Sequence, residues 1–222
     1  MEFVPSIDPS AGVAAMAARL ASELGKGKVL WLVCGGSNIP LSARAMDAVR
    51  AQVAPEALAN LTVGLTDERY GPLGHADSNW KQLEDAHFNV EGIKTIPILT
   101  GKPLAETVAE YARHLEAALA EKPFVVAQFG IGADGHIAGT LPHTSAVASQ
   151  DLVYGYEAAP FVRITLALAH FSIINAAYAF AFGGSKKEAI FRLKNEDLRL
   201  EDLPCQILKR LPEAYFYTDQ IG

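Results

Sequence analysis

The clearest pattern in the chain is a run of six consecutive apolar residues at positions 29–34. A strand that is apolar on both faces is typical of the centre of a parallel sheet, because helices cover both sides of such a sheet. Before this run, apolar residues recur at helical spacing from Val13 to Leu24, and Gly25 stands where such a helix would end. The pattern predicts a first helix that begins near Asp8 or Ser10, followed by a buried strand.

Strand and helix patterns continue to alternate along the rest of the chain. After the first strand, further strands are predicted at residues 61–66, 95–99, 124–129, 152–156, 163–168, 178–182 and 215–217. After the first helix, a second helix is predicted to end at residue 53, and later helices to cover residues 79–88, 104–120, 186–193 and 205–208. Right-handed crossovers through helices return the chain parallel to the preceding strand. We predict an α/β fold with a mainly parallel, doubly wound (Rossmann-like) sheet and helices on both faces. No repeat or linker divides it, so residues 1–222 are expected to form one domain.

One stretch, residues 164–185, has no charged residue and approaches the length of a membrane-spanning helix. It contains His170 and Asn175, however, and two alternating pieces flank a short helical piece, which predicts strand, helix and strand. The first residues also lack the basic start and apolar core of a secretory signal. We therefore expect a cytoplasmic protein that does not bind membranes.

Composition narrows the classes of function. The chain has 19 Lys and Arg against 25 Asp and Glu, a formal net charge of −6. Nucleic acids and anionic membranes require a basic face, so neither is an expected partner. Two cysteines in 222 residues do not indicate a disulfide scaffold. An anionic small molecule would need a local basic pocket.

Four loops that follow predicted strands carry the candidate chemistry, because ligands of open α/β sheets bind beyond the carboxyl ends of the strands. These loops are residues 35–38, 67–69, 130–136 and 183–186. The first precedes a helix, whose N-terminal N–H groups and dipole favour an anion. Arginine and lysine can chelate or cover a phosphate. The candidate phosphate-binding residues are Gly35, Gly36, Ser37, Arg69 and Lys186, with Lys187 as the competitor of Lys186.

The third loop contains the main catalytic candidates, Asp134 and His136, which share a side in extended geometry. Imidazole groups titrate at about 6.5, which suits a general acid or base. Asp67 and Arg69 complete the candidate set, as an orienting carboxylate and an oxyanion-stabilising cation. Each loop also has a purely structural explanation: a tight turn that needs glycine, charged residues exposed to solvent, or a histidine without a catalytic role. The histidines lack metal-ligand spacing, and no Gly-x-Ser-x-Gly motif indicates a serine hydrolase.

Together the loops resemble the 6-phosphogluconolactonases, in order and in approximate spacing, over nearly the whole chain. The segments that carry the resemblance are Gly35-Gly36-Ser37, Asp67-Glu68-Arg69 with Asp77-Ser78-Asn79, residues 130–136 with Ala138 and Pro142, Arg163-Ile164-Thr165-Leu166, and Gly183 with Lys186.

The same superfamily contains the glucosamine-6-phosphate deaminase/isomerases, which share the sugar-phosphate pocket. They carry Phe-Asn-Glu-Pro after the Asp-Gly-His-Ile-Ala segment, and its glutamate supports ring opening. Here the matching residues are Gly139-Thr140-Leu141-Pro142, and leucine has no acid or base chemistry. Ile137, by contrast, is the deaminase-like residue where lactonases have threonine. Asn38-Ile39-Pro40 also departs from the usual Thr-Pro after the first serine.

The resemblance implies hydrolysis of 6-phospho-D-glucono-1,5-lactone to 6-phospho-D-gluconate, a step of the oxidative pentose phosphate pathway, without a metal or organic cofactor. His136 would activate water as general base, Asp134 or Asp67 would orient it, and Arg69 would serve the phosphate or the oxyanion. Two alternatives stay open: a deaminase/isomerase with Asp67 as the base, and a non-catalytic sugar-phosphate sensor. The expected partner is a sugar phosphate, and the protein is expected to be a monomer or a small homo-oligomer.

Overall fold

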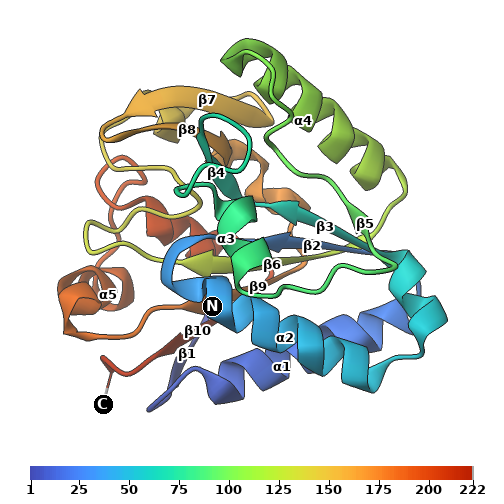
Figure 1. Ribbon diagram of the computed structural model, residues 1–222. Helices are drawn as coiled ribbons and strands as arrows, with labels where there is room; N and C mark the ends of the chain where they lie inside the picture. Colours follow the sequence, from blue (N-terminus) through green and yellow to red (C-terminus); the bar gives the residue numbers. More distant parts are fainter. Residues whose placement is uncertain (222) are drawn as a thin grey trace.

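A seven-stranded parallel sheet forms the centre of the computed structural model, which describes residues 1–221 (Figure 1). Gly222, the last residue of the predicted domain, lies outside the described residues. From edge to edge the strands are β1 (Glu2–Pro5), β10 (Glu213–Thr218), β9 (Ala176–Phe180), β6 (Phe124–Gly130), β2 (Val29–Val33), β3 (Leu61–Leu65) and β5 (Lys94–Thr95). Every neighbouring pair is parallel. The predicted α/β fold is confirmed.

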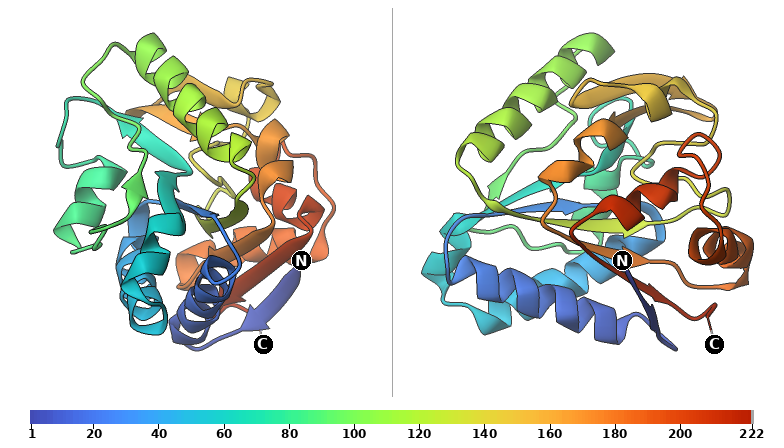
Figure 2. Two further views of the ribbon diagram at one scale, coloured as in Figure 1. Left: turned by 90° about the vertical axis from the view of Figure 1, so that its right-hand side faces the viewer. Right: turned by 180° about the vertical axis from the view of Figure 1, so that it is seen from behind.

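Helices cover both faces of this sheet, as the figures show from three sides (Figure 1, Figure 2). The helices are α1 (Ser10–Leu24), α2 (Ile39–Gln52), α3 (Asn79–Asp85), α4 (Leu104–Ala120) and α5 (Lys187–Asn195). The first two pack side by side on one face, and α4 lies on the other. Short 3-10 helices complete the chain: η1 (Gly36–Asn38), η2 (Pro55–Asn60), η3 (Ser145–Ala148), η4 (Leu168–Ile173), η5 (Gly184–Lys186) and η6 (Pro204–Arg210).

The apolar patterns of the sequence account for the core. All five residues of β2 are buried, with Trp31 completely so. Met16 and Leu20 of α1 are likewise inaccessible to solvent, as its helical spacing predicts. The uncharged stretch at residues 164–185 contains the end of a strand, η4 and β9, so its prediction as strand, helix and strand is confirmed. Among residues 1–221, no helix has the length and apolar character needed to cross a membrane.

A second, antiparallel sheet of three strands was not predicted. It consists of β4 (Asp67–Tyr70), β8 (Phe161–Leu166) and β7 (Val153–Ala158), in that order. Residues 67–69, predicted as a loop, are therefore in a strand; that prediction was wrong because three consecutive charged residues conceal the strand. Residues 152–156 and 163–168 do form strands, but outside the parallel sheet.

Two further differences occur at the edges of the main sheet. Residues 2–5 form β1, which was not predicted, because a run this short gives no measurable alternation. At the other edge, β5 covers Lys94–Thr95 only, whereas residues 95–99 were predicted. Neither difference alters the centre of the sheet, where the loops after β2, β6 and β9 meet at one edge because the strands are parallel.

Candidate active site

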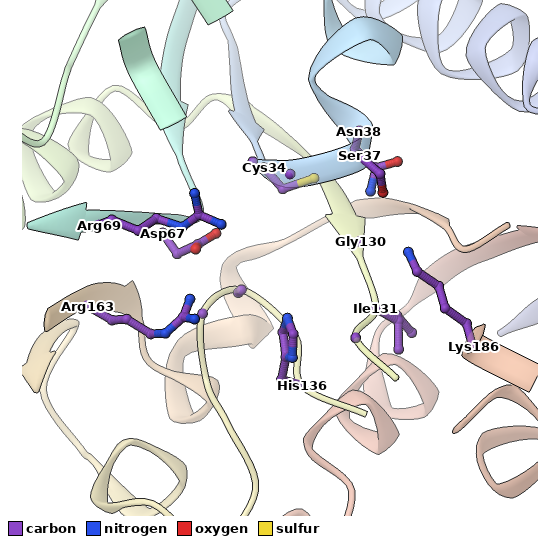
Figure 3. Close-up of a pocket in the computed structure, with 15 residues that line it drawn as sticks. Cys34, Ser37, Asn38, Asp67, Arg69, Gly130, Ile131, His136, Arg163 and Lys186 are labelled. Atoms are coloured by element: carbon purple, nitrogen blue, oxygen red, sulfur yellow. The ribbon is translucent and has the colours of Figure 1, made fainter. Parts of the chain in front are cut away.

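A cavity of about 230 Å³ opens where these loops meet the small sheet (Figure 3). Residues after β2, β6 and β9 form one side of it, and β4 and β8 contribute the other. It is lined by Cys34, Gly35, Gly36, Ser37, Asn38, Asp67, Arg69, Gly130, Ile131, Gly132, His136, Ala138, Gly139, Arg163 and Lys186. The small sheet that the sequence did not predict thus forms a wall of the cavity.

The cavity brings together most of the residues singled out in the sequence. Those that line it are Gly35, Gly36, Ser37, Asp67, Arg69, His136 and Lys186. Asp134 does not line the cavity but is hydrogen-bonded to His136. Lys187 does not line it either, so Lys186 is the lysine of this pair that borders the cavity.

Asp134 and His136 form a hydrogen-bonded pair. Asp134 Oδ1 lies 2.6 Å from His136 Nδ1 and accepts the His136 backbone N–H at 3.1 Å. Burial acts to raise the pKa of Asp134, but the hydrogen bond and charge of His136 outweigh burial and hold that pKa below its ordinary value. Among residues 1–221, Nε2 of His136 has no hydrogen-bond partner. The pair therefore leaves one ring nitrogen free for proton transfer.

The loop around this pair leaves no room for a side chain at position 132. The Gly132 N–H donates to the His136 carbonyl at 3.1 Å, and the Gly135 N–H donates to the Gly132 carbonyl at 3.0 Å. A Cβ at position 132 would lie 2.1 Å from His136 Nδ1 and 2.5 Å from Asp134 Oδ1. This close approach of the backbone explains why residue 132 is a glycine. It also restricts the position of the His136 ring on the side that faces Gly132.

Asp67 is a buried carboxylate on the cavity wall, with 7% of its surface exposed. Its Oδ1 accepts a hydrogen bond from the Thr66 hydroxyl at 3.1 Å, and its backbone carbonyl accepts one from Asn79 Nδ2 at 2.8 Å. No hydrogen bond joins Asp67 to His136 within the described chain. Of the two carboxylates considered for orienting His136, Asp134 is the one in contact.

Two arginines lie opposite each other on the small sheet. Arg69 of β4 and Arg163 of β8 are cross-strand partners, and both line the cavity. Their guanidinium carbons lie 5.3 and 5.5 Å from the centroid of the Phe161 ring. Arg69 Nη1 donates to the Asp77 carbonyl at 2.9 Å, but the buried Nε of each arginine has no hydrogen-bond partner among residues 1–221. This wall therefore offers two cations with unused donors.

Arg163 was not among the candidate site residues. Its segment did contribute to the family resemblance. In the sequence, Arg163 could have been singled out as the one charged residue at the start of an apolar strand. Strand alternation alone does not show which face such a residue occupies. The pairing of β8 with β4 places it beside Arg69.

A second cationic region lies on the other side of His136. Figure 3 shows Lys186 and Ser37 there, across the cavity from Arg69 and Arg163. Burial lowers the pKa of Lys186, and the neighbouring Cys34 opposes that shift. Ser37 belongs to η1, directly before α2, so backbone N–H groups and a helix dipole face the same region.

The part of the chain that the structure describes contains no group of three His, Cys, Asp or Glu side chains able to hold a metal ion. The main polar groups of the cavity are instead a histidine held by a carboxylate outside the lining, a buried carboxylate, three cationic side chains, and the side chains of Ser37 and Asn38. Such a set suits an anionic substrate and proton transfer.

Sequence comparison identifies the family. A model of the family described as glucosamine-6-phosphate isomerases/6-phosphogluconolactonase matches residues 9–215. The chain belongs to this family.

Within this glucosamine-6-phosphate isomerase/6-phosphogluconolactonase family, the chain is similar to the 6-phosphogluconolactonase of Homo sapiens. The two are 27% identical over 187 residues, which cover 79% of this chain and 71% of the human protein. The resemblance carried by the sequence loops is thereby confirmed.

Solved structures of both branches of the family share the fold. The 6-phosphogluconolactonase from Shewanella baltica OS155 superposes with a TM-score of 0.79 at 22% identity, over 97% of each chain. A monomeric glucosamine-6-phosphate deaminase of the NagB superfamily also gives a TM-score of 0.79, at 16% identity, over 98% of this chain and 97% of its own. The fold therefore does not distinguish the two reactions, and the residues of the cavity must do so.

Proposed function

We propose that this chain hydrolyses 6-phospho-D-glucono-1,5-lactone to 6-phospho-D-gluconate. The observation that carries the proposal is the Asp134–His136 pair, placed in a cavity between two cationic regions. The name of the human relative supports the same reaction. A dianionic phosphate and a carbonyl that becomes an oxyanion both need positive charge, and the two ends of this cavity supply it.

In the proposed reaction, His136 removes a proton from water as the water oxygen attacks the C1 carbonyl. The tetrahedral oxyanion collapses, the bond between C1 and the ring oxygen breaks, and His136 returns its proton to that oxygen. The new carboxylic acid then ionises and releases a proton. Asp134 holds Nδ1 and stabilises the transient imidazolium charge, in the manner of the carboxylate in a Ser-His-Asp triad.

The phosphate is proposed to bind at the end of the cavity formed by Gly35, Gly36, Ser37 and Lys186. Backbone N–H groups at the start of α2 and a partly buried ammonium favour an anion there. Arg69 and Arg163 then lie near the reacting carbonyl, where bidentate guanidinium groups would stabilise the oxyanion. A phosphate anchored away from the reacting carbon contributes binding energy that orients the lactone.

The position of Leu141 favours hydrolysis over deamination. The resemblance puts Leu141 where deaminases carry their ring-opening glutamate. Here its side chain packs with Ala146, Tyr156 and Ala158 in a small apolar cluster, and it does not line the cavity. The deaminase-like Ile137 is completely buried, so its identity affects packing rather than the cavity surface.

The test is the rate of acid release from freshly generated lactone, with the spontaneous rate subtracted. General-base catalysis contributes about 10²- to 10⁴-fold, so His136→Ala should lose that factor in kcat. His114→Ala, an exposed histidine on α4, is the matched control and should retain full activity.

Each other result points to a different conclusion. Full activity in His136→Ala would exclude His136 as the base. Ammonia release from glucosamine 6-phosphate by the wild type, without lactone turnover, would identify a deaminase. Calorimetric binding of sugar phosphates without either reaction would identify a sensor.

A further inference from the structure

Glu68 lies between two cavity residues in the sequence but does not line the cavity. Side chains alternate along a strand, so Asp67 and Arg69 of β4 face the cavity while Glu68 faces the opposite side. Its side chain is completely buried, with 0% of its surface exposed, against the first turn of α3. The reaction proposed above does not use this carboxylate.

Four hydrogen-bond donors converge on the Glu68 carboxylate. Oε1 accepts the backbone N–H groups of Arg69 at 2.7 Å and Asn79 at 2.6 Å. Oε2 accepts the Ser78 hydroxyl at 2.9 Å and the backbone N–H of Trp80 at 3.0 Å. Within the described chain, no cationic side chain forms an ion pair with it. Oriented N–H groups at a helix start therefore stabilise the negative charge.

These donors require a group that only accepts hydrogen bonds. An ionised carboxylate meets that requirement, whereas an amide of the same shape would turn its NH₂ toward at least one N–H. Ser78 could turn its hydroxyl to accept such an NH₂, but the backbone N–H of Trp80, 3.0 Å from the same oxygen position, cannot change from donor to acceptor. Burial raises the pKa of Glu68, and its hydrogen bonds oppose that rise.

The bonds of Glu68 also fix the segment that holds the Arg69 guanidinium. Asp77 directly precedes Ser78, and its carbonyl accepts Arg69 Nη1 at 2.9 Å. Glu68 thus constrains Arg69 in two ways. It accepts the Arg69 backbone N–H directly, and it holds Ser78, whose neighbour Asp77 accepts the Arg69 guanidinium. Displacing residues 77–80 would move the acceptor that orients the guanidinium in the cavity.

A second path leads from Glu68 through Asn79. The Asn79 N–H is bonded to Glu68, and its side-chain Nδ2 donates to the Asp67 carbonyl at 2.8 Å. A Cβ at Gly35 would lie 1.9 Å from Asn79 Oδ1, so Asn79 also packs directly on the first glycine loop. One buried carboxylate therefore connects three separate parts of the cavity wall.

We propose that the ionised Glu68 is a positioning residue that acts through Arg69. This inference rests on the proposed lactone hydrolysis for its kinetic readout. Glu68 touches neither substrate nor reacting atoms; it holds the first turn of α3 against β4 so that Arg69 meets the substrate in one orientation.

The test is a double-mutant cycle on kcat/KM with Glu68→Gln, Arg69→Ala and the double variant. Misplacement by about 1 Å costs on the order of 10²-fold, so Glu68→Gln should lose about 10- to 100-fold. In the Arg69→Ala background the same change should cost much less, because its main target is absent and only the path through Asn79 remains. A purely structural role would give independent, multiplicative losses and would overturn the proposal. Glu84→Gln, exposed on the same helix, should match wild type.

Folding measurements and two further variants keep the proposal testable if Glu68→Gln does not fold. Circular dichroism and thermal unfolding report the folded state of each variant. Glu68→Asp keeps the charge and should recover part of the activity lost in Glu68→Gln. Ser78→Ala removes one donor and leaves the carboxylate; it should give a smaller loss with the same dependence on Arg69, and independence from Arg69 would overturn the proposal.

Failure of this inference and failure of the proposed function give different results. If wild type hydrolyses the lactone and Glu68→Gln does so equally well, the role of Glu68 is wrong and the function stands. If wild type does not hydrolyse the lactone, the proposed function is wrong. The same four proteins are then compared by their Kd for 6-phosphogluconate, measured by calorimetry. Non-additive losses in Kd would then support the positioning role, and additive losses would overturn it.

Discussion

The Asp134–His136 pair depends on its immediate backbone as much as on its own side chains. Asp134 is hydrogen-bonded to both the ring Nδ1 and the main-chain N–H of His136, so a single carboxylate fixes the orientation of the ring and the conformation of the loop. Gly132 passes behind the pair, and Gly135 adopts a φ of +83°, a conformation that side chains disfavour. Close approach therefore explains Gly132, whereas Gly135 is explained by its backbone conformation and by a Cβ position only 2.2 Å from Leu203 Cδ1.

A substitution at the first of these glycines should reduce activity although it changes neither Asp134 nor His136. Gly132→Ala places a Cβ within 2.1 Å of His136 Nδ1, so the pair must shift. We expect a loss of about 10²-fold in kcat/KM, the effect of misplacing a catalytic group by about 1 Å. Steady-state lactone kinetics measure it. Gly27→Ala, where an added Cβ meets open space, should behave as wild type; equal activity in both variants would contradict this account.

Pairing of β4 with β8 gives the cavity its arginine wall. The register sets Arg69 directly opposite Arg163, and two like charges so placed repel each other. The Phe161 ring lies within 5.5 Å of both guanidinium carbons. Cation–π attraction to one ring offsets part of the repulsion and orients both side chains.

Removing that ring should weaken substrate binding as well as the fold, because the arginines lose a contact that orients them. Each cation–π contact contributes about 0.5–1 kcal/mol, so two contacts correspond to about 1–2 kcal/mol, or about 10-fold in affinity. Phe161→Leu should raise KM for the lactone and Kd for 6-phosphogluconate by about that factor. Phe161→Tyr keeps an aromatic face and is the matched control. Unchanged affinity in the leucine variant would show that packing alone orients the arginines.

At the scale of the whole molecule, one hydrophobic core runs through the parallel sheet and the helices on both of its faces. Exposed and half-buried carboxyl groups around it are held in their charged form by local partners. In five of them a side-chain hydrogen bond is the largest cause of a pKa below the ordinary value: Asp8, Glu110, Glu121, Asp202 and Asp219. Glu68 is the opposite case, since burial raises its pKa.

These shifts predict the pH dependence of stability. A carboxyl whose pKa is lower in the folded state stabilises the fold above its unfolded value, 3.8 for Asp and 4.5 for Glu, and loses that contribution as pH falls through the folded value. Because Asp134 and these five groups act this way and Glu68 acts the other way, Tm should fall progressively below about pH 4.5. Added salt should flatten the decline, since exposed pairs are screened.

Calorimetry between pH 7 and pH 3 measures this dependence, and a Tm that stays constant or rises on acidification would contradict it. We also propose that the chain is one domain, as its pattern predicts, so the same scans should show one transition. Two separate transitions would contradict that proposal.

Much of this protein follows from local pattern. The helical spacing at residues 104–120 predicted α4 with its observed bounds, and the apolar run at 29–34 predicted the central strand, because burial of an element requires a matching period of apolar residues. Gly35, Gly36, Ser37 and Lys186 also lie around one cavity, because parallel strands present their carboxyl ends at one edge. Arg69 reaches the same cavity from the antiparallel sheet.

What the sequence by itself determined is therefore the type of each long element and which loops after the parallel strands border the cavity. The antiparallel sheet, the place of Arg163 and the burial of Glu68 were decided only by tertiary structure. Residues 67–70 form a short segment of three charged residues and one tyrosine, so they have no apolar period. Their strand exists because they pair with the distant residues 162–165. Contacts between segments far apart in the chain leave no periodic signal in either segment alone.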